Sequence, residues 1–361
     1  MDGIDAALVA IENGRTRLRH ALTHPYTPEL HTRLERLLDP DWQGPLTEVG
    51  HLHAALGDHF ARAARALLES ADVSAHTIRA IGSHGQTVCH APGGGEAFSL
   101  QLADASRIAA GTGITTVADF RSMDIALGGQ GAPLVPAFHA DVFASPDEHR
   151  VILNLGGIAN ITDLPRTVED APVRGFDTGP ASTLMDGWIR RHRGQDFDAD
   201  GAWAASGTPI TALLQALLAE SYLSLPPPKS TGREHFNLAW LDRQLDGLSL
   251  ETAAPADVQA TLLEFTATTA ATAIMQHCTG TERVIVCGGG THNGSLMRRL
   301  DELMPGIPVE DSGAHGIAPD WVEAMTFAWL AHQTLQGHPG NLPSVTGAAR
   351  AAVLGAIHTG S

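Results

Sequence analysis

Apolar and polar positions follow two patterns along this chain, and each pattern predicts one kind of secondary structure. Short apolar runs bounded by glycine predict buried strands, and they cover 5–11, 151–155 and 284–287. Apolar residues at helical spacing predict helices. The clearest helices cover 27–38, 46–68 and 257–278, the last with Gly280 as a natural C-terminal cap. Because strands and helices alternate throughout, the pattern predicts an α/β fold with two related halves.

Polar side chains flanked by glycine follow several of the apolar runs. Residues 81–88 read I-G-S-H-G-Q-T-V, and 118–121 and 128–136 have the same character. A hydrophobic core would use apolar residues there, whereas a strand edge exposes side chains and backbone N–H groups. We therefore expect His84 to contact a small polar ligand. A hydrogen bond from His84 to a neighbouring backbone group is the alternative.

Two glycine turns follow the strands predicted at 151–155 and 284–287. Gly156 and Gly157 follow the first, and 288–290 follow the second, ahead of a helix expected near 295–300. A strand, a glycine turn and a helix N-terminus together suit the binding of phosphate oxygens. One such turn is equally typical of a plain connection, but two similar turns favour nucleotide binding.

Several further side chains could carry chemistry. Asp177 lies in G-F-D-T-G-P, which predicts a glycine-bounded turn. Its carboxylate could act as a general base or hold Mg²⁺, although the short motif alone favours an Asx-turn. Lys229 and Arg233 follow three prolines and could contact phosphate or sugar, but most such loops are only solvated. Glu323, within an apolar helix, is expected near the helix N-terminus or facing a polar cleft.

Composition limits the function classes. The 361 residues suit about two to three domains or two lobes. A net charge of −17 argues against a nucleic-acid partner but not against a nucleotide. Three cysteines without a C-x-x-C, and no long apolar run, predict a cytoplasmic protein with no membrane partner. His51 and His53 lie two apart on a predicted helix and share no face, so a zinc hydrolase is not favoured.

Seven motifs occur together and in order: S-H-G-Q-T-V, A-D-F-R-S-x-D, G-G-Q-G-A-P-L-V-P-A-F-H, L-N-L-G-G-I-A-N-I-T, G-F-D-T-G-P, K-S-T-G-R-E-x-F and C-G-G-G-x-x-N. With them, nearly the whole chain resembles the anhydro-N-acetylmuramic acid kinases. The resemblance implies the two-lobed α/β fold of the sugar kinase, hsp70 and actin superfamily (ribonuclease H-like), with ATP in a central cleft. We expect a sugar-side lobe at 1–133, a nucleotide-side lobe at 134–361, and a homodimer.

The resemblance also implies a reaction. Water opens the 1,6-anhydro bridge of the amino sugar while ATP phosphorylates O6, giving N-acetylmuramate 6-phosphate in cell-wall (peptidoglycan) recycling. Asp177 matches the catalytic aspartate, which deprotonates the water. The expected sugar-binding residues are His84, Gln86, Thr87, Arg121 and Glu323. The residues expected to face ATP and Mg²⁺ are Asp2, Gly3, Asp5, Gly156, Gly157, Asn160, Gly288, Gly289 and Asn293. No metal ligand is assigned.

The start of the chain departs from the family pattern. Family members carry M-S-G-T-S-x-D-G-I-D at the first strand, whereas this chain begins Met1-Asp2-Gly3-Ile4-Asp5. The absent S-G-T-S loop would grip the β- and γ-phosphates. We expect Met1 to be an internal methionine of a longer chain. The alternative is a catalytically weak or inactive sugar-binding or regulatory protein on the same scaffold.

Overall fold

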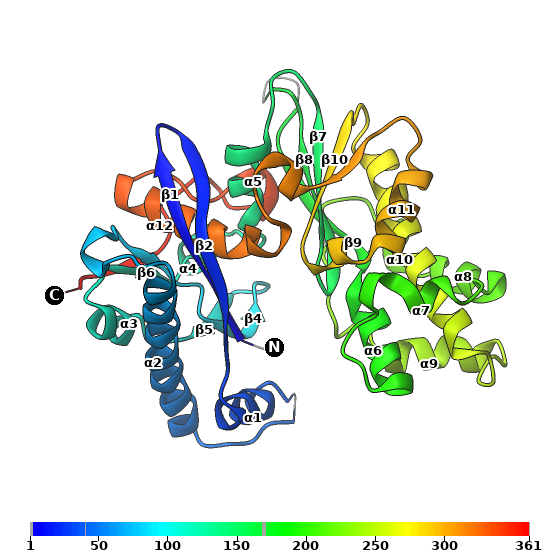
Figure 1. Cartoon of the computed structure of the whole chain (residues 1–361), viewed down its shortest axis with the longest axis horizontal. Helices are drawn as coiled ribbons and strands as arrows, with labels where there is room; N and C mark the ends of the chain where they lie inside the picture. The colour runs from blue at the N-terminus through cyan, green and yellow to red at the C-terminus, as the bar shows by residue number, and fades with distance from the viewer. Residues whose placement is uncertain (1–2, 40, 168–170, 361) are drawn as a thin grey trace. The chain divides into compact units, whose positions relative to one another are not determined.

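The computed structural model describes residues 3–39, 41–167 and 171–360, and its chain divides into two compact units (Figure 1). Unit 1 comprises Met1–Phe138 and Trp321–Ser361, and unit 2 comprises His139–Asp320. Both units mix helices with sheets, which confirms the expected α/β class. The sequence analysis expected each lobe to be one continuous segment, 1–133 and 134–361. In the structure, unit 1 is made of two segments of the chain, one from each end. The chain returns to unit 1 because helix α12 (Val322–Gln336) packs against strands β1 and β3 of that unit.

Unit 1 contains two hairpins and a small sheet. The hairpins are β1 (Gly3–Glu12) with β2 (Arg15–Pro25), and β4 (Gln86–Ala91) with β5 (Phe98–Leu102). The sheet has the order β12-β6-β3, formed by Ala356–His358, Thr116–Ala118 and Ile81–Gly82. The helices of this unit besides α12 are α1 (Pro28–Leu37), α2 (Leu46–Ser70), α3 (Ala105–Thr112), α4 (Ser122–Ala126), α5 (Val135–Phe143, which crosses the unit boundary) and α13 (Pro343–Thr346).

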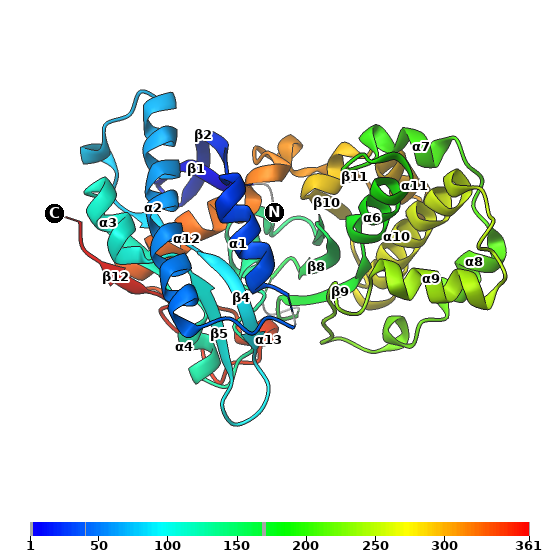
Figure 2. The same ribbon diagram turned by 90° about the horizontal axis from the view of Figure 1, so that it is seen from below.

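Helix α2 lies beside the β1–β2 hairpin in both views (Figures 1 and 2) and also packs on α3. Its fully buried Leu52 and Leu56 join Leu34 of α1 and Ile108 of α3 in one cluster. Thr27 begins α1 by accepting a hydrogen bond from the Leu30 amide, as expected of an N-cap threonine. The helices predicted at 27–38 and 46–68 and the strand predicted at 5–11 are confirmed.

Unit 2 is built on a five-stranded sheet with the order β11-β10-β7-β8-β9. These strands are Val309–Asp311, Arg283–Cys287, Arg150–Leu155, Ile158–Leu164 and Arg174–Pro180. Strand β10 runs parallel to β7 and β11, whereas β8 runs antiparallel to both of its neighbours, β7 and β9. The helices are α6 (Ser182–Arg193), α7 (Ala202–Ala205), α8 (Thr211–Leu218), α9 (Leu238–Gly247), α10 (Pro255–His277) and α11 (Gly294–Leu303).

Helix α10 is the centre of the unit 2 core. It contacts β8, β9 and four neighbouring helices, and Phe265, Ala267 and Ala270 are fully buried. The predicted helix at 257–278 is confirmed, but its predicted cap is wrong. The Cys278 amide closes the last turn on the Ile274 carbonyl, so the helix ends before Gly280 is reached.

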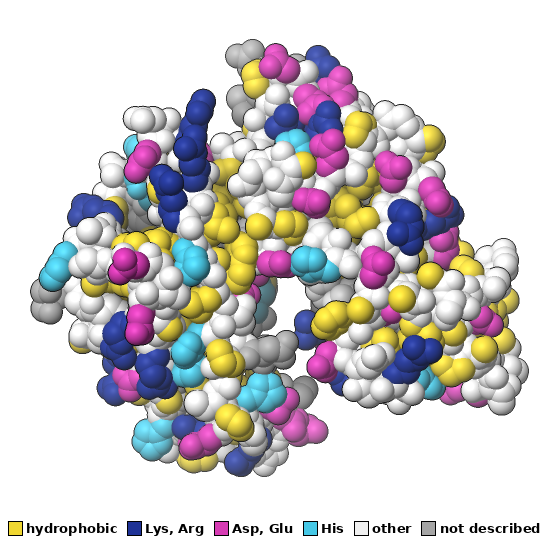
Figure 3. Space-filling model, in the orientation of Figure 1, with side chains coloured by type: hydrophobic (Ala, Val, Ile, Leu, Met, Phe, Trp, Pro, Cys, Tyr) yellow, Lys and Arg dark blue, Asp and Glu magenta, His cyan; other side chains and the backbone are white. Residues whose placement is uncertain are grey.

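The surface is mixed in charge. On the face shown in Figure 3, basic side chains of both units intermingle with acidic ones. In the part of the chain that the structure describes, every helix is too short or too polar to cross a membrane.

Candidate functional site

In unit 1, His84 and Arg121 form a compact pair. His84 follows β3, and Arg121 begins α4. The Nε and Nη2 atoms of Arg121 lie 3.2 and 2.7 Å from His84 Nε2. Because a guanidinium can only donate, Nε2 must accept and the ring proton belongs on Nδ1. Burial, followed by the charge of Arg121, lowers the pKa of His84 to about 3, so the imidazole is neutral at physiological pH.

Glu323 supplies the opposite charge. It stands in the first turn of α12, as expected, where the helix dipole favours a carboxylate. The side chain is exposed to a cavity, but the surrounding protein displaces enough water to raise its pKa. The positive charge of Arg121 opposes that rise and the negative charge of Asp5 adds to it. Unit 1 thus brings a cation, a neutral imidazole and two carboxylates into one electrostatic neighbourhood.

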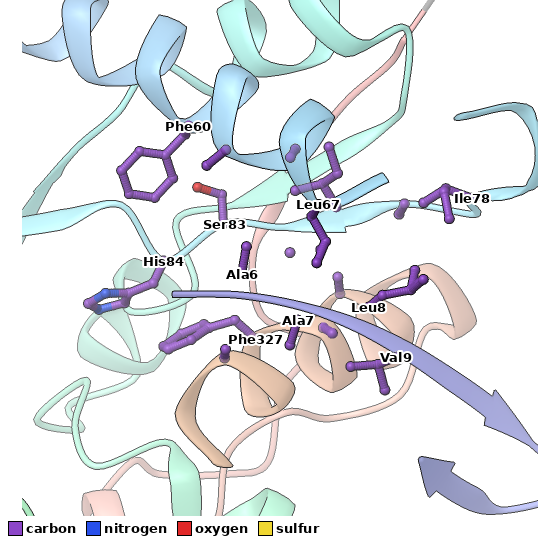
Figure 4. A pocket seen from close by; sticks show the side chains of 18 of the residues that line it. Ala6, Ala7, Leu8, Val9, Phe60, Leu67, Ile78, Ser83, His84 and Phe327 are labelled. Carbon is purple, nitrogen blue, oxygen red and sulfur yellow. The ribbon is translucent and has the colours of Figure 1, made fainter. Parts of the chain in front are cut away.

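The cavity has a volume of about 970 Å³ and is bounded by β1, α2, β3 and α12 (Figure 4). Figure 4 shows Ser83 and His84 toward one end, and Leu8, Leu67 and Ile78 farther along. Asp5, Gln86, Thr87 and Glu323 also line it. The apolar part offers a polar sugar few hydrogen bonds, so only the polar end has the chemistry of a sugar site.

Gln86 and Thr87 stand at the start of β4. Gln86 accepts a weak hydrogen bond of 3.4 Å from the Tyr26 hydroxyl, and Thr87 accepts one of 3.2 Å from Gln101. Gln86 Nε2 also donates to the Thr87 carbonyl at 3.2 Å, which leaves its second N–H and the Thr87 hydroxyl proton for a ligand. All five residues expected to bind sugar therefore belong to unit 1, and all except Arg121 line the cavity.

In unit 2, Asp177 lies within strand β9, so the predicted turn at this position is wrong. The flanking glycines are strand residues, and Asp177 pairs with Asn160 of β8. The Asx-turn alternative is also wrong, because the carboxylate accepts from another segment. Ser230 Oγ and the Thr231 amide both donate to Asp177 Oδ2 at 2.9 Å.

The two hydrogen bonds leave the carboxylate asymmetric. Both fall on Oδ2, and within the described residues no donor reaches Oδ1. Burial raises the pKa of Asp177, with Glu234 contributing to the rise, while the bonds from Thr231 and Ser230 and the charge of Lys229 oppose it. An anchored carboxylate with one free oxygen and a raised pKa is suited to accept a proton.

The two glycine turns predicted to face a nucleotide lie together at the ends of β7 and β10. Asn154 of β7 pairs with Cys287 of β10, and a Cβ on Gly288 would lie 2.6 Å from Asn154 Oδ1. Gly288 has φ +83°, so its backbone also requires glycine. A Cβ on Gly289 would meet nothing within 4 Å, which leaves this backbone open to a ligand.

The first glycine turn, formed by Gly156 and Gly157, already makes several contacts within the protein. The carbonyls of Gly156 and Gly157 accept hydrogen bonds from the amides of 181–183 and so cap α6. A Cβ on Gly157 would lie 2.8 Å from Thr183 Oγ1 and 2.9 Å from an Arg233 nitrogen. Gly157 is therefore needed for packing as well as for any contact with a nucleotide.

Other expected nucleotide residues also make structural contacts. Asn293 Oδ1 caps α11 by accepting from the Leu296 amide, and Asp200 accepts from the Gly294 amide. The predicted helix near 295–300 is confirmed, but these first amides are already bonded. Gly3 is packed against the His24 carbonyl, and Asp5 accepts a 2.7 Å hydrogen bond from Thr23 across the hairpin. Asp2 lies outside the described residues.

The loop after the three prolines separates its two cations. Lys229 Nζ donates to the carbonyls of Tyr222 and Leu223 at 3.3 and 2.9 Å and lies over the Tyr222 ring, so it is a structural residue. Arg233 is exposed beside Gly157, and no acceptor within the described residues bonds it. Of the two, only Arg233 is available to an anionic ligand.

Three supporting residues were not predicted. Asn154 is a polar residue inside an apolar strand, which was a usable signal. Tyr222 donates to the Asp177 carbonyl at 2.9 Å, and no local pattern indicates this contact. Asp124 ends the A-D-F-R-S-x-D motif and is fully buried. Within the described residues, no cluster of three or more His, Cys, Asp or Glu side chains is arranged to hold a metal ion.

The model of the anhydro-N-acetylmuramic acid kinase family matches residues 1–360. A protein of that name from Xanthomonas campestris pv. campestris is 53% identical over 360 residues, which are 99% of this chain and 94% of the relative. Another, from Thiobacillus denitrificans, is 52% identical with the same coverage.

A solved structure, the activator of the 2-hydroxyisocaproyl-CoA dehydratase from Clostridium difficile with bound ADPNP, matches at a TM-score of 0.45 and 10% identity. That match covers 91% of this chain and 92% of the other. The family assignment rests on the sequence matches, which extend over nearly every residue. The chain belongs to the anhydro-N-acetylmuramic acid kinase family.

Proposed function

We propose that this chain is an ATP-dependent kinase that opens the 1,6-anhydro ring of anhydro-N-acetylmuramic acid and phosphorylates O6. The products are N-acetylmuramate 6-phosphate and ADP, formed in the recycling of cell-wall sugar. Family membership supports the reaction, and the observation that carries the mechanism is the Asp177 carboxylate. Its Oδ2 is fixed by two hydrogen bonds, while Oδ1 has no donor within the described residues.

Asp177 acts as the general base. Its Oδ1 takes a proton from water as the water oxygen bonds to C1 of the sugar. The C1–O6 bond breaks, and the electron pair left on O6 attacks the γ-phosphorus of ATP, so that ADP leaves. Coupling these steps means that the O6 alkoxide is consumed as it forms, and in-line positioning supplies most of the acceleration. The raised pKa of Asp177 makes the carboxylate a stronger base than an ordinary aspartate.

Unit 1 binds the sugar through its polar groups. Arg121 and Glu323 offer a charged donor and a charged acceptor to the sugar substituents, and Gln86 and Thr87 add neutral ones. His84 is neutral, so its role is to hold the Arg121 fork in one orientation. Water remains a competitor at each of these positions, which is why the fixed geometry matters for affinity.

Unit 2 binds the nucleotide at the turn that contains Gly289. The open backbone there can approach phosphate oxygens, and Arg233 can add a charge-assisted contact. The amide oxygens of Asn154 and Asn160 are hard donors beside the glycine turns, which fits Mg²⁺ bound directly or through its waters. Bound with ATP, Mg²⁺ would neutralise charge on the β- and γ-phosphates. The family resemblance further supports a cytoplasmic homodimer, which sedimentation would test for its dimeric state.

A coupled ADP-release assay with the anhydro sugar tests the function. Wild-type chain should release ADP only when the sugar is present. Mass spectrometry should find a product heavier by one water and one phosphoryl group, because ring opening adds water. Absence of sugar-dependent ADP would show the proposed function to be wrong.

Asp177→Asn tests the base. It should lower kcat by a factor of about 10² to 10⁴, as expected for loss of general base catalysis, while sugar binding measured by calorimetry stays close to wild type. Asp242→Asn, which changes a surface carboxylate paired with Arg191 in the same unit, is the matched control. Near-normal kcat in Asp177→Asn would assign the base elsewhere.

A further inference from the structure

One buried carboxylate close to the sugar-binding residues is not used by the proposed mechanism. Asp124, in α4, is fully buried and lies three residues after Arg121. A buried carboxylate is costly unless several donors satisfy it. Asn341 Nδ2 donates to Oδ1 at 2.6 Å, Thr346 Oγ1 donates to Oδ1 at 2.7 Å, and the Gly131 amide donates to Oδ2 at 2.8 Å.

The loop 128–131 folds around this carboxylate. The Gly129 amide donates to the Asp124 carbonyl at 2.9 Å, and a Cβ on Gly129 would overlap the carboxylate itself. Gly131 has φ +68°, a conformation that glycine adopts without cost. Asp124 therefore anchors two backbone amides of this loop, those of Gly129 and Gly131.

The backbone of Gly131 also contacts Arg121. The Gly131 carbonyl accepts a hydrogen bond of 2.7 Å from Arg121 Nη1. Gly131 thus binds Asp124 through its amide and Arg121 through its carbonyl. The guanidinium is held on its other side by His84 Nε2, so within the described residues its hydrogen bonds go to two partners, Gly131 and His84.

The C-terminal segment closes the network. Asn341 and Thr346 are nearly fully buried, and Asn341 Oδ1 accepts from the Ala352 amide at 2.7 Å. The Gln130 amide donates to the Thr346 carbonyl at 2.8 Å. Two segments more than 200 residues apart in sequence therefore meet at one carboxylate.

We propose that Asp124, with Asn341 and Thr346, is a positioning residue that fixes the Arg121 guanidinium for the sugar through the backbone amide and carbonyl of Gly131. Asp124 touches no reacting group, and it acts through hydrogen bonds and through its negative charge near the guanidinium. The inference rests on the proposed function, because it gives Arg121 the sugar as its ligand. A role in stability alone would affect both substrates equally, whereas positioning of Arg121 affects the sugar.

Asp124→Asn replaces one accepting carboxylate oxygen with an NH₂ group, which can only donate. The groups around this side chain are donors, since Asn341 and Thr346 both donate to Oδ1. It should lower kcat/KM for the sugar by about 10- to 100-fold, the cost of a misplaced binding group, and leave the KM for ATP unchanged. The exchanged double variant, Asp124→Asn with Asn341→Asp, restores a donor opposite an acceptor and should recover most of the loss. Thr346→Val removes the hydroxyl and should give a smaller loss of kcat/KM for the sugar. Thr346→Ser keeps the hydroxyl and should give no such loss.

Thr334→Val is the matched control for stability. Thr334 is a buried threonine of the same unit, and its hydroxyl lies within hydrogen-bond distance of both the Leu330 and Leu354 carbonyls. Its loss should lower Tm without changing the KM for the sugar. Equal effects of Asp124→Asn on ATP and sugar, or failure of the folded double variant to recover, would overturn the inference. If Asp124→Asn does not fold, the comparison of Thr346→Val with Thr346→Ser decides in the same way.

Failure of the proposed function is distinguished by the wild-type chain. If wild type shows no sugar-dependent ADP release, the proposed function fails, and calorimetric affinity for the sugar is compared across the same variants. A wild-type affinity that Asp124→Asn weakens and the exchange restores would still support positioning. A wild-type chain that does not bind the sugar would overturn both proposals.

Discussion

Ser230→Ala tests the mechanism most directly because it changes the pKa of the proposed base and leaves the base in place. Ser230 Oγ donates to Asp177 Oδ2 at 2.9 Å, and the Thr231 amide donates to the same oxygen. Both bonds favour the ionised carboxylate. Removing the hydroxyl leaves Oδ2 anchored by one donor, so the carboxylate should keep its orientation while its pKa rises.

The size of the rise follows from the strength of the lost bond. A hydrogen bond to a charged group contributes about 1.5–3 kcal/mol in mutational series. Ser230 is exposed, so water replaces part of the lost contact and the effect falls below that range. A loss of about 0.7–1.4 kcal/mol corresponds to about 0.5–1 pKa unit. Asp177 must be ionised to take a proton, and burial already raises its pKa above the ordinary value of about 3.9. The acidic limb of the kcat profile should therefore move to higher pH by that amount.

The assay is the pH dependence of sugar-dependent ADP release at saturating ATP. Well above the acidic limb, Ser230→Ala should turn over at nearly the wild-type rate, because the carboxylate is ionised in both. Ser206→Ala removes a serine hydroxyl whose one hydrogen-bond partner within the described residues is the Trp203 carbonyl, and its profile should match that of wild type. An acidic limb that stays in place, or that moves to lower pH, would refute the role of Asp177 as the titrating base.

Further predictions concern the glycine turn, the histidine and the stability of the base variant. Gly288→Ala should destabilise unit 2 by at least about 1–3 kcal/mol, from backbone strain at φ +83° with a clash against Asn154 in addition; Gly289→Ala should leave urea unfolding near wild type but raise the KM for ATP, and the reverse pattern would contradict the proposed site. Because His84 titrates at about 3, the sugar KM should show no transition from His84 between about pH 5 and pH 8, and a step near pH 6.5 that His84→Gln removes would contradict this. Because burial raises the pKa of Asp177, folding favours the protonated carboxyl over the carboxylate. The stability that this group contributes is fully present below its unfolded pKa and is lost as the pH rises through its folded pKa. At neutral pH, Asp177→Asn should therefore be at least as stable as wild type by thermal unfolding.

Much of the fold was predictable because its main elements carry their own signals. Helix α2 has an uninterrupted apolar stripe, α1 has a threonine cap and a proline in its first turn, and β7 and β10 are apolar runs that end in glycine. The strand around Asp177 was not predicted, because Gly175 and Gly179 are typical of a turn. Its pairing with β8 is a contact between segments, and no local pattern encodes it.

The candidate site divides in the same way. The motifs identified residues of the right chemistry, and the family matches support them, but a motif does not say which polar group is already bonded. Lys229 and Arg233 have the same charge and lie in one loop. The first donates to two carbonyls, and the second lies open beside a glycine turn.

Supporting contacts decide how a recognised motif works. Residues 229–231 bind the Tyr222 carbonyl, the Asp177 amide and the Asp177 carboxylate, so one short segment fixes both the backbone and the side chain of the base. Asp124 does the same for Arg121 through Gly131. In each case a peptide group, the Thr231 N–H or the Gly131 carbonyl, is one of the groups that hold the charged side chain. The side chains that orient those peptides are therefore where substitutions should change the kinetics without removing a reacting group.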